Sequence, residues 1–191
     1  MLRKFIRIIK RDGATVTFKR ILAYAISHSP LAYRLSFSHA IGTRLYFAPT
    51  QLTYNLFAKP ISRGGDIKVL QTYVSEGATV IDVGANIGSI AIPAAALAGP
   101  TGRVLTFEPS QKFFNIIKKN VVCNKFTDRI TVHQVALGPK EDTVYLNEEV
   151  SDDTTNHIAA TGTPVSQRNL DSFTNYIKTV DFLKIDVEGY E

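Results

Sequence analysis

Residues 79–92, with the sequence TVIDVGANIGSIAI, place an apolar β-branched run directly before a Gly-x-Asn-x-Gly turn and a helical pattern. Such a run is typical of a strand that is buried on both faces of a parallel sheet. Asp82 lies at the carboxyl end of this strand, where open α/β sheets bind their ligands. Gly84 and Gly88 permit unusual dihedral angles and a close approach to a ligand. The stretch therefore predicts a small-molecule site in an α/β fold.

The spacing of the turn disfavours a dinucleotide. The nicotinamide fingerprint is G-x-G-x-x-G, whereas Asn86 takes the place of its middle glycine and Ser89 takes the place of its third. A pyrophosphate is therefore not expected to pass as close to the backbone as it does in NAD-binding folds. A nicotinamide-dependent oxidoreductase stays open as an alternative, which a titration with NAD would test.

Three motifs in order resemble those of the FkbM family of S-adenosylmethionine-dependent methyltransferases. They are DVGANIG at 82–88, FEP at 107–109 and LKIDVEGYE at 183–191. The resemblance implies a Rossmann-like class I methyltransferase sheet, mostly parallel, that uses S-adenosyl-L-methionine. It also implies O-methylation of a hydroxyl on a sugar, glycan or natural product. The family continues with further strands and helices, so we expect the chain to be truncated at its C-terminus relative to the family.

The predicted cofactor site combines the glycine turn with an acidic residue at the end of the next strand. Glu108 lies 24 residues after Gly84, at the end of a strand predicted at 103–107, where an acidic side chain accepts hydrogen bonds from ribose hydroxyls. This geometry indicates an adenosine ligand without choosing between NAD and S-adenosylmethionine. The resemblance places Ala136 near the adenine. The predicted cofactor-binding residues are Asp82, Gly84, Ala85, Asn86, Gly88, Glu108 and Ala136.

Asp186 and Glu188 end a fourth predicted strand, at 182–187, beside the expected position of the methyl group. Methyl transfer from a sulfonium is an in-line displacement that needs a positioned acceptor oxygen and a group that takes one proton. We expect Asp186 first and Glu188 second to position or deprotonate the acceptor. Alternatively, the pair fixes the loop or binds the amino group of the cofactor. His133 is expected to be structural.

No metal site is predicted, because His157 has no neighbouring ligands at a defined spacing; Asp152 and Asp153 are nearby but form no recognised pattern. The polar residues 151–163 are instead predicted to form a mobile loop near the site. The single cysteine, Cys123, suits a reducing compartment. We therefore expect a cytoplasmic protein, with peripheral membrane contact as an option.

The net charge of +5 is concentrated near the N-terminus. Residues 1–35 carry eight Lys and Arg side chains against Asp12 alone, a net charge of +7, so that the remainder carries −2. Helices are expected at 2–9 and 17–26. This arm could contact an anionic membrane peripherally, or it could be a solvated helix face. We expect no specific nucleic-acid partner.

The chain is predicted to have three segments and an open sheet edge. The segments are a basic helical arm at 1–41, a β-hairpin and helix lead-in at 42–78, and an incomplete methyltransferase domain at 79–191. We expect hairpin strands at 44–47 and 52–56, and a core sheet in the order 3-2-1-4 with helices on both faces. The fourth strand would then be an edge that favours self-association. A truncated, catalytically inactive remnant that binds cofactor is the third functional hypothesis.

Overall fold

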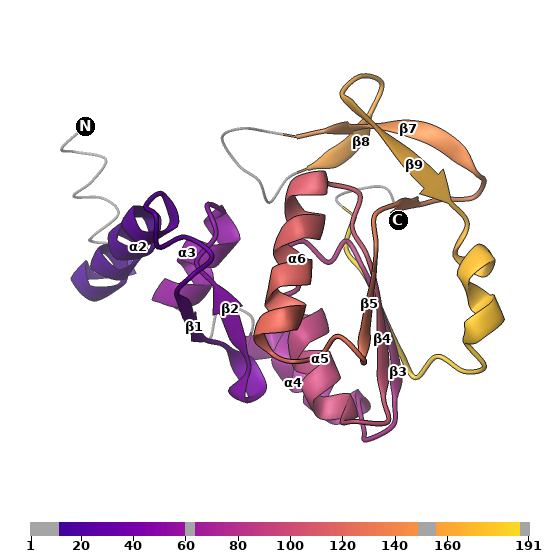
Figure 1. Cartoon of the computed structure of the whole chain (residues 1–191), viewed down its shortest axis with the longest axis horizontal. Helices are drawn as coiled ribbons and strands as arrows, with labels where there is room; N and C mark the ends of the chain where they lie inside the picture. Colours follow the sequence, from indigo (N-terminus) through magenta and orange to yellow (C-terminus); the bar gives the residue numbers. More distant parts are fainter. Residues whose placement is uncertain (1–11, 60–63, 149–155, 188–191) are drawn as a thin grey trace.

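A four-stranded parallel sheet forms the centre of the fold (Figure 1). The structure is a computed structural model that describes residues 12–59, 64–148 and 156–187. The strands lie in the order β10 (Phe182–Ile185), β3 (Thr79–Val83), β4 (Arg103–Phe107) and β5 (Ile130–His133). All three pairings are parallel, and β3 lies inside the sheet. This order confirms the predicted 3-2-1-4 arrangement.

The α-helices that follow the N-terminal unit cover one face of this sheet. They are α4 (Gly64–Tyr73), α5 (Ala91–Ala98) and α6 (Gln111–Cys123). The other face carries the 3₁₀ helix η3 (Leu170–Tyr176), whose Phe173 packs against Ile81, Val83 and Phe107. The prediction of helices on both faces is therefore correct only in that a short 3₁₀ helix covers the second face.

Capping residues define where two of the helices begin. The side chain of Ser110 accepts a hydrogen bond from the N–H of Phe113 at the start of α6, and Thr50 does the same for Thr53 at the start of α3 (Gln51–Ala58). The predicted strand at 52–56 is therefore wrong. Its alternating apolar residues also suit a short, largely buried helix, because short apolar runs do not distinguish the two structures.

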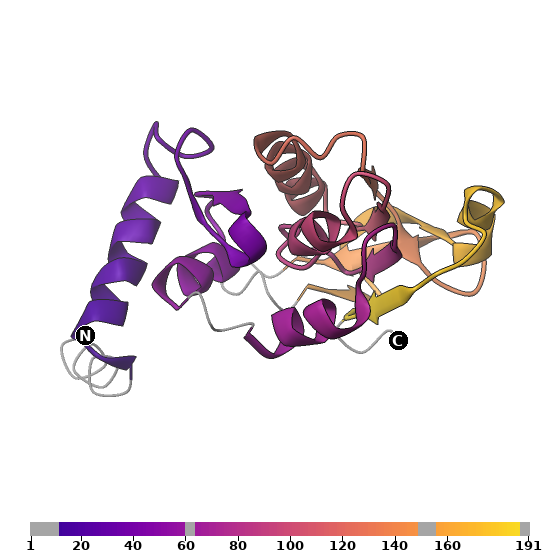
Figure 2. The ribbon, with the colours of Figure 1, turned by 90° about the horizontal axis from the view of Figure 1, so that it is seen from below.

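The N-terminal unit consists of α2 (Ala14–Ser27), α3 and a small antiparallel hairpin (Figure 2). The hairpin pairs β1 (Ser36–Ser38) with β2 (Arg44–Tyr46), and the 3₁₀ turn η1 (Ala40–Gly42) connects them. The hairpin thus lies earlier than predicted, and a boundary between 41 and 42 would cut through it. The predicted helix at 2–9 lies outside the described residues.

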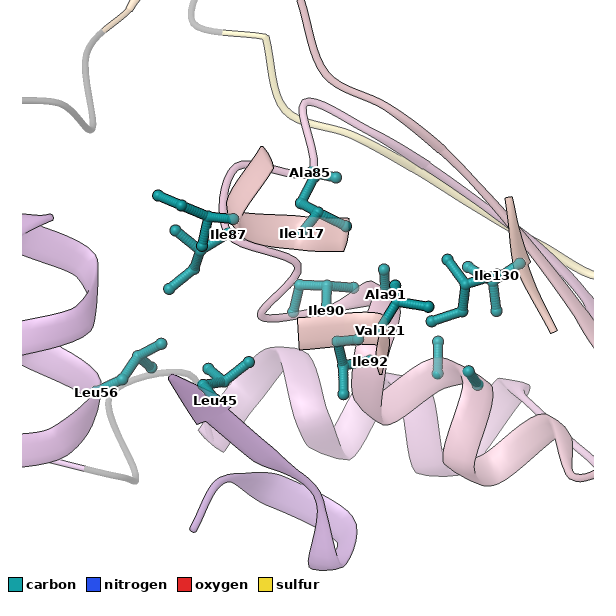
Figure 3. Packing of buried hydrophobic residues seen from close by; sticks show 14 of the residues in the cluster. Leu45, Leu56, Ala85, Ile87, Ile90, Ala91, Ile92, Ile117, Val121 and Ile130 are labelled. Carbon is teal, nitrogen blue, oxygen red and sulfur yellow. The ribbon is translucent and has the colours of Figure 1, made fainter. Parts of the chain in front are cut away.

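One hydrophobic core joins the N-terminal unit to the sheet and its helices (Figure 3). Leu45 of β2 and Leu56 of α3 belong to the same buried cluster as Ile87, Ile92 and Ile117. Burial of large apolar side chains is the main stabilising contribution in folding, so the unit and the sheet stabilise each other. In its described part the basic arm contributes Ala23 and Phe37 to this core.

A second sheet lies across the carboxyl ends of the parallel strands (Figure 1). Its strands, in order, are β6 (Ala136–Leu137), β9 (Thr163–Arg168), β7 (Asp142–Asn147) and β8 (His157–Ala159). Residues 130–137 do not form one continuous strand, because they divide into β5 and β6, which belong to different sheets. The loop expected at 151–163 is corrected in part, because β8 lies within it; residues 151–155 are outside the described residues.

None of the helices in the described part of the chain has the length and apolarity needed to cross a bilayer.

Candidate functional site

A cavity of about 220 Å³ opens at the carboxyl ends of β3, β4 and β10. It is lined by the turn after β3, by the residues after β4, and by β6 and β8 of the second sheet. Lys184, Asp186 and Val187 line it from β10 and the residues that follow. Ligands of parallel α/β sheets bind at this edge. The cavity therefore lies where the sequence predicts a small-molecule site.

Glu108 is a buried carboxylate in the wall of this cavity. Its Oε2 accepts a hydrogen bond from the backbone N–H of Asn86 at 2.8 Å, and its Oε1 accepts one from Ser110 at 2.9 Å. Burial raises the pKa of Glu108 from 4.5 to about 7, although the two backbone N–H groups act in the opposite direction. A carboxylate has about four acceptor sites, so Glu108 keeps capacity for the hydroxyls of a ligand.

The turn between β3 and α5 depends on two residues with left-handed backbone angles. Asn86 has φ 51°, and Asn is one of the residue types that adopts this region most readily. Gly84 has φ 72°, and a Cβ there would collide with the backbone carbonyl oxygen of Asp186. The sequence predicts that Gly84 permits the close approach of a ligand. In the structure, the chain after β10 makes a close approach to Gly84.

Lys184 connects β3, the turn and Asp186. Its Nζ lies 3.1 Å from Oδ1 of Asp82, its partner in register on β3, and 3.5 Å from Oδ2 of Asp186. It also donates hydrogen bonds to the carbonyl oxygens of Val83 and Gly84, at 3.3 and 3.0 Å. The side chain of Asp82 is completely buried, and a buried charge is tolerated only when it is paired. Lys184 therefore holds the carboxyl ends of β3 and β10 together.

The structure brings together most, but not all, of the predicted site. Gly84, Ala85, Asn86, Glu108 and Ala136 line the cavity. Neither Asp82 nor Gly88 lines the cavity: Asp82 pairs with Lys184, and a Cβ on Gly88 would meet Ile92 and Ile117. The side chain of Asp186 is 46% exposed at the cavity, whereas Glu188 lies outside the described residues.

The methyltransferase FkbM domain matches residues 82–191, which is more than half of the chain. The chain belongs to the FkbM methyltransferase family. S-adenosylmethionine is the methyl donor of this family, and the parallel sheet described above is its Rossmann-like core. The match leaves the nicotinamide alternative without support.

Solved structures resemble only part of this FkbM chain. An S-adenosylmethionine-dependent O-methyltransferase from Thermotoga maritima is 18% identical, with a TM-score of 0.38, over 52% of this chain and 40% of that one. An S-adenosylmethionine-dependent methyltransferase from Aquifex aeolicus is 21% identical, with a TM-score of 0.33, over 44% of this chain and 43% of that one. A candidate rRNA methylase from Clostridium thermocellum is 28% identical, with a TM-score of 0.38, over 39% and 40%. The FkbM chain thus spans about two fifths of the length of each. No curated protein matches it significantly.

The cavity suits the hydrogen-bonding groups of S-adenosylmethionine. Glu108 offers carboxylate oxygens to ribose hydroxyls. Asn156 lines the same cavity, and its buried Oδ1 has no hydrogen-bond partner within the described residues. A buried amide oxygen of this kind is costly unless it is paired, so it is available to an N–H group of a ligand. The residues of the FkbM site therefore fit the family cofactor.

Two buried side chains that support the cofactor turn have no signal in the sequence. Nδ2 of Asn120 donates a hydrogen bond to the carbonyl oxygen of Ile87 at 2.8 Å, and its Oδ1 accepts one from the N–H of Tyr46 at 2.9 Å. His39 donates to the carbonyl oxygen of Ser89 at 2.9 Å. These partners are 33 to 74 residues apart in the chain, so local patterns do not reveal them. Lys184 could have been found, because it lies two residues before Asp186 in the strand predicted at 182–187 and therefore on the same face.

His133 and His157, the two histidines discussed in the sequence analysis, differ in their position relative to the cavity. The ring of His133 stacks on Phe107, with ring centroids 5.0 Å apart, and burial lowers the pKa of His133. It does not line the cavity, whereas His157 does. Within the described residues, no group of three or more His, Cys, Asp or Glu side chains could hold a metal ion.

Proposed function

We propose that the chain is an S-adenosylmethionine-dependent O-methyltransferase that acts on a hydroxyl group of a sugar, a glycan or a natural product. The observation that supports an oxygen acceptor is the position of Asp186. Its carboxylate lies at the carboxyl end of the parallel sheet, lines the cavity and stays half exposed. An acceptor that enters from solvent can therefore reach it.

The chain holds the donor through residues that follow β3 and β4 and through residues of the second sheet and its approach. Glu108 accepts hydrogen bonds from the ribose hydroxyls, and Asn156 accepts one from an N–H group. Ala85 and Ala136, both buried in the cavity wall, leave room for the nucleoside. When bound, S-adenosylmethionine supplies a methyl group on a positively charged sulfur, which leaves as a neutral thioether.

Asp186 positions the acceptor and takes its proton. The acceptor hydroxyl donates a hydrogen bond to the carboxylate, which directs a lone pair of the acceptor oxygen into the cavity. As the new carbon–oxygen bond forms, the hydroxyl proton passes to Asp186 and then to water, because this carboxylate is half exposed. The ion pair with Lys184 fixes the carboxylate relative to the turn.

Apolar residues limit water at this site. The second sheet and the residue that precedes it line one side of the cavity with apolar side chains, namely Val135, Leu137, Leu146 and Ile158. Exclusion of water strengthens the electrostatic interactions within a site and suppresses hydrolysis. The second sheet therefore serves as a wall of the reaction site.

Replacement of Asp186 by Asn tests the proposal. With a labelled methyl donor and a panel of saccharide and natural-product hydroxyls, the parent chain should form a methyl ether. The variant Asp186→Asn should lose about a hundredfold to ten-thousandfold in turnover and keep its cofactor affinity. Asp128→Asn, an exposed carboxylate elsewhere, is the matched control.

Each alternative gives a different result in this experiment. Loss of cofactor affinity in Asp186→Asn would assign this residue to the amino group of the cofactor. If the parent chain binds the cofactor and methylates no hydroxyl, the remnant hypothesis holds. If Glu188→Gln loses turnover and Asp186→Asn does not, the proton acceptor is Glu188.

A further inference from the structure

The helix α2 leaves large apolar side chains exposed. Phe18, Ile21, Leu22 and Tyr24 are 66%, 51%, 39% and 55% exposed. The residues that α2 buries are small, namely Thr17, Ala23 and Ser27. A surface helix normally directs its large apolar side chains inward. We call the four exposed side chains the outer face of α2.

The outer face lies in a strongly cationic part of the chain. Residues 1–59 contain ten Lys and Arg side chains and one acidic residue, Asp12, so that their net charge is +9 and that of the remainder is −4. Asp12 is nearly buried and is paired with both Arg20 and Lys59. Lys19 follows Phe18 on α2 and is half-buried, whereas Arg20 is held in its pair with Asp12. The described residues 12–59 hold five of these Lys and Arg side chains against Asp12, so an anionic partner meets attraction at this end of the molecule.

The outer face is also remote from the candidate site. The two views place α2 at the end of the molecule, with α3 and the hairpin between it and the parallel sheet (Figures 1 and 2). The cavity lies at the carboxyl ends of that sheet. A partner bound to α2 would therefore leave the cavity open.

We propose that the outer face of α2 docks on the surface of a bilayer that contains anionic lipid. A helix with an apolar face between cationic residues binds in the interfacial plane, because the apolar side chains enter the headgroup boundary while the cations face lipid phosphates. A second copy of the chain is a weaker candidate, because it would bring two segments of net charge +9 together.

Vesicle sedimentation tests this docking. The full chain is mixed with vesicles of phosphatidylcholine alone and with vesicles that also contain phosphatidylglycerol, at low and at physiological salt. We expect binding to the anionic vesicles that weakens as salt rises. The variant Phe18→Ser/Ile21→Ser should lower the partition coefficient about tenfold. Lys19→Gln should lower it about fivefold at low salt.

Val122→Ser is the matched control, because Val122 is a 63% exposed apolar residue on α6. It should bind the anionic vesicles like the parent. All of these side chains are exposed or half-buried, and circular dichroism verifies that each variant stays folded. The proposal is overturned if the parent does not bind anionic vesicles, or if Phe18→Ser/Ile21→Ser binds them as well as Val122→Ser does. A dimer that only Phe18→Ser/Ile21→Ser dissociates, without vesicle binding, would assign the face to a second copy.

Discussion

His39 donates a hydrogen bond from Nε2 to the carbonyl oxygen of Ser89, across 2.9 Å. Ser89 lies four residues before Pro93, which has no N–H and so cannot donate the helical hydrogen bond to that carbonyl. The neighbouring bonds are present, from Ile92 to Gly88 and from Ala94 to Ile90. His39 therefore replaces the donor that Pro93 lacks, and the N-terminal unit completes the first turn after the cofactor turn.

Removal of the His39 side chain should show that it replaces the hydrogen-bond donor that Pro93 lacks. His39→Ala should lower the free energy of unfolding by about 1 to 3 kcal/mol, because the buried Ser89 carbonyl loses its partner. In a Pro93→Ala background the cost should be clearly smaller, since the new N–H can donate to Ser89. Chemical denaturation of both single variants and the double variant measures the difference. Equal costs in the two backgrounds would contradict this account.

Asn120 should control cofactor affinity from outside the cavity. Asn120→Ala removes the bonds to Ile87 and Tyr46, so the turn loses a support and the affinity for S-adenosylmethionine should fall about fivefold to tenfold. Asn124 is the matched control, because it caps α6 one turn after Asn120 and its side chain bonds to the backbone of Arg44 and Asn120, not to the cofactor turn. Asn124→Ala should keep the parent affinity in calorimetry. A similar loss of affinity in both variants would indicate a general effect on stability.

Cofactor affinity should depend on pH through Glu108. The carboxylate accepts hydroxyl hydrogens when it is ionised, and its pKa is about 7. The ionised fraction falls from about nine tenths at pH 8 to about one tenth at pH 6, so the association constant should fall about tenfold. Calorimetry at several pH values measures this, and in Glu108→Gln the dependence should disappear. A parent affinity that is flat from about pH 6 to about pH 8 would rule out titration of Glu108.

The same pKa has a consequence for the unliganded protein. Because burial raises the pKa of Glu108 above its ordinary value of 4.5, the folded state binds the proton more tightly than the unfolded state does. The stabilising effect is complete below about pH 4.5 and is lost as the pH rises through 7. Glu108→Gln should therefore reduce the decline of the unfolding free energy across this window.

The edge of the parallel sheet should promote self-association. Within the described residues β10 pairs with β3 alone, and Leu183 and Ile185 are 47% and 50% exposed. Exposed strand edges with apolar side chains invite pairing with another chain. Sedimentation velocity should show association that increases with concentration and that Leu183→Lys reduces, while Val122→Lys leaves it unchanged. A monomer at every concentration would contradict this prediction.

The parallel sheet follows from local sequence, whereas the second sheet does not. The β-branched run at 79–83 and the turn after it fix β3 and its place inside the sheet, because such a strand must be buried on both faces. β6 and β8 have two and three residues, too few to show an alternating pattern. β6 forms through pairing with β9, which follows two further strands along the chain, and β8 forms through pairing with β7, the strand before it.

The candidate site also has residues that the sequence locates and contacts that it does not. Gly84, Asn86 and Glu108 are visible in the sequence, because motif spacing and strand ends locate them. The sequence does not show that Asp82 faces Lys184 rather than the cavity, since this depends on the register between β3 and β10. Contacts such as that of Asn120 with Ile87 arise only from packing of helix against turn.

Titration of the chain with S-adenosylmethionine in a calorimeter tests the central claim most directly. The parent should bind the cofactor, and Glu108→Ala should weaken binding by about 1 to 3 kcal/mol, because a charged hydrogen-bond acceptor is lost. Asp128→Asn should bind like the parent, and NAD should not compete. If the parent does not bind S-adenosylmethionine, or if folded Glu108→Ala binds it with the parent affinity, the cavity at the ends of β3 and β4 is not the cofactor site.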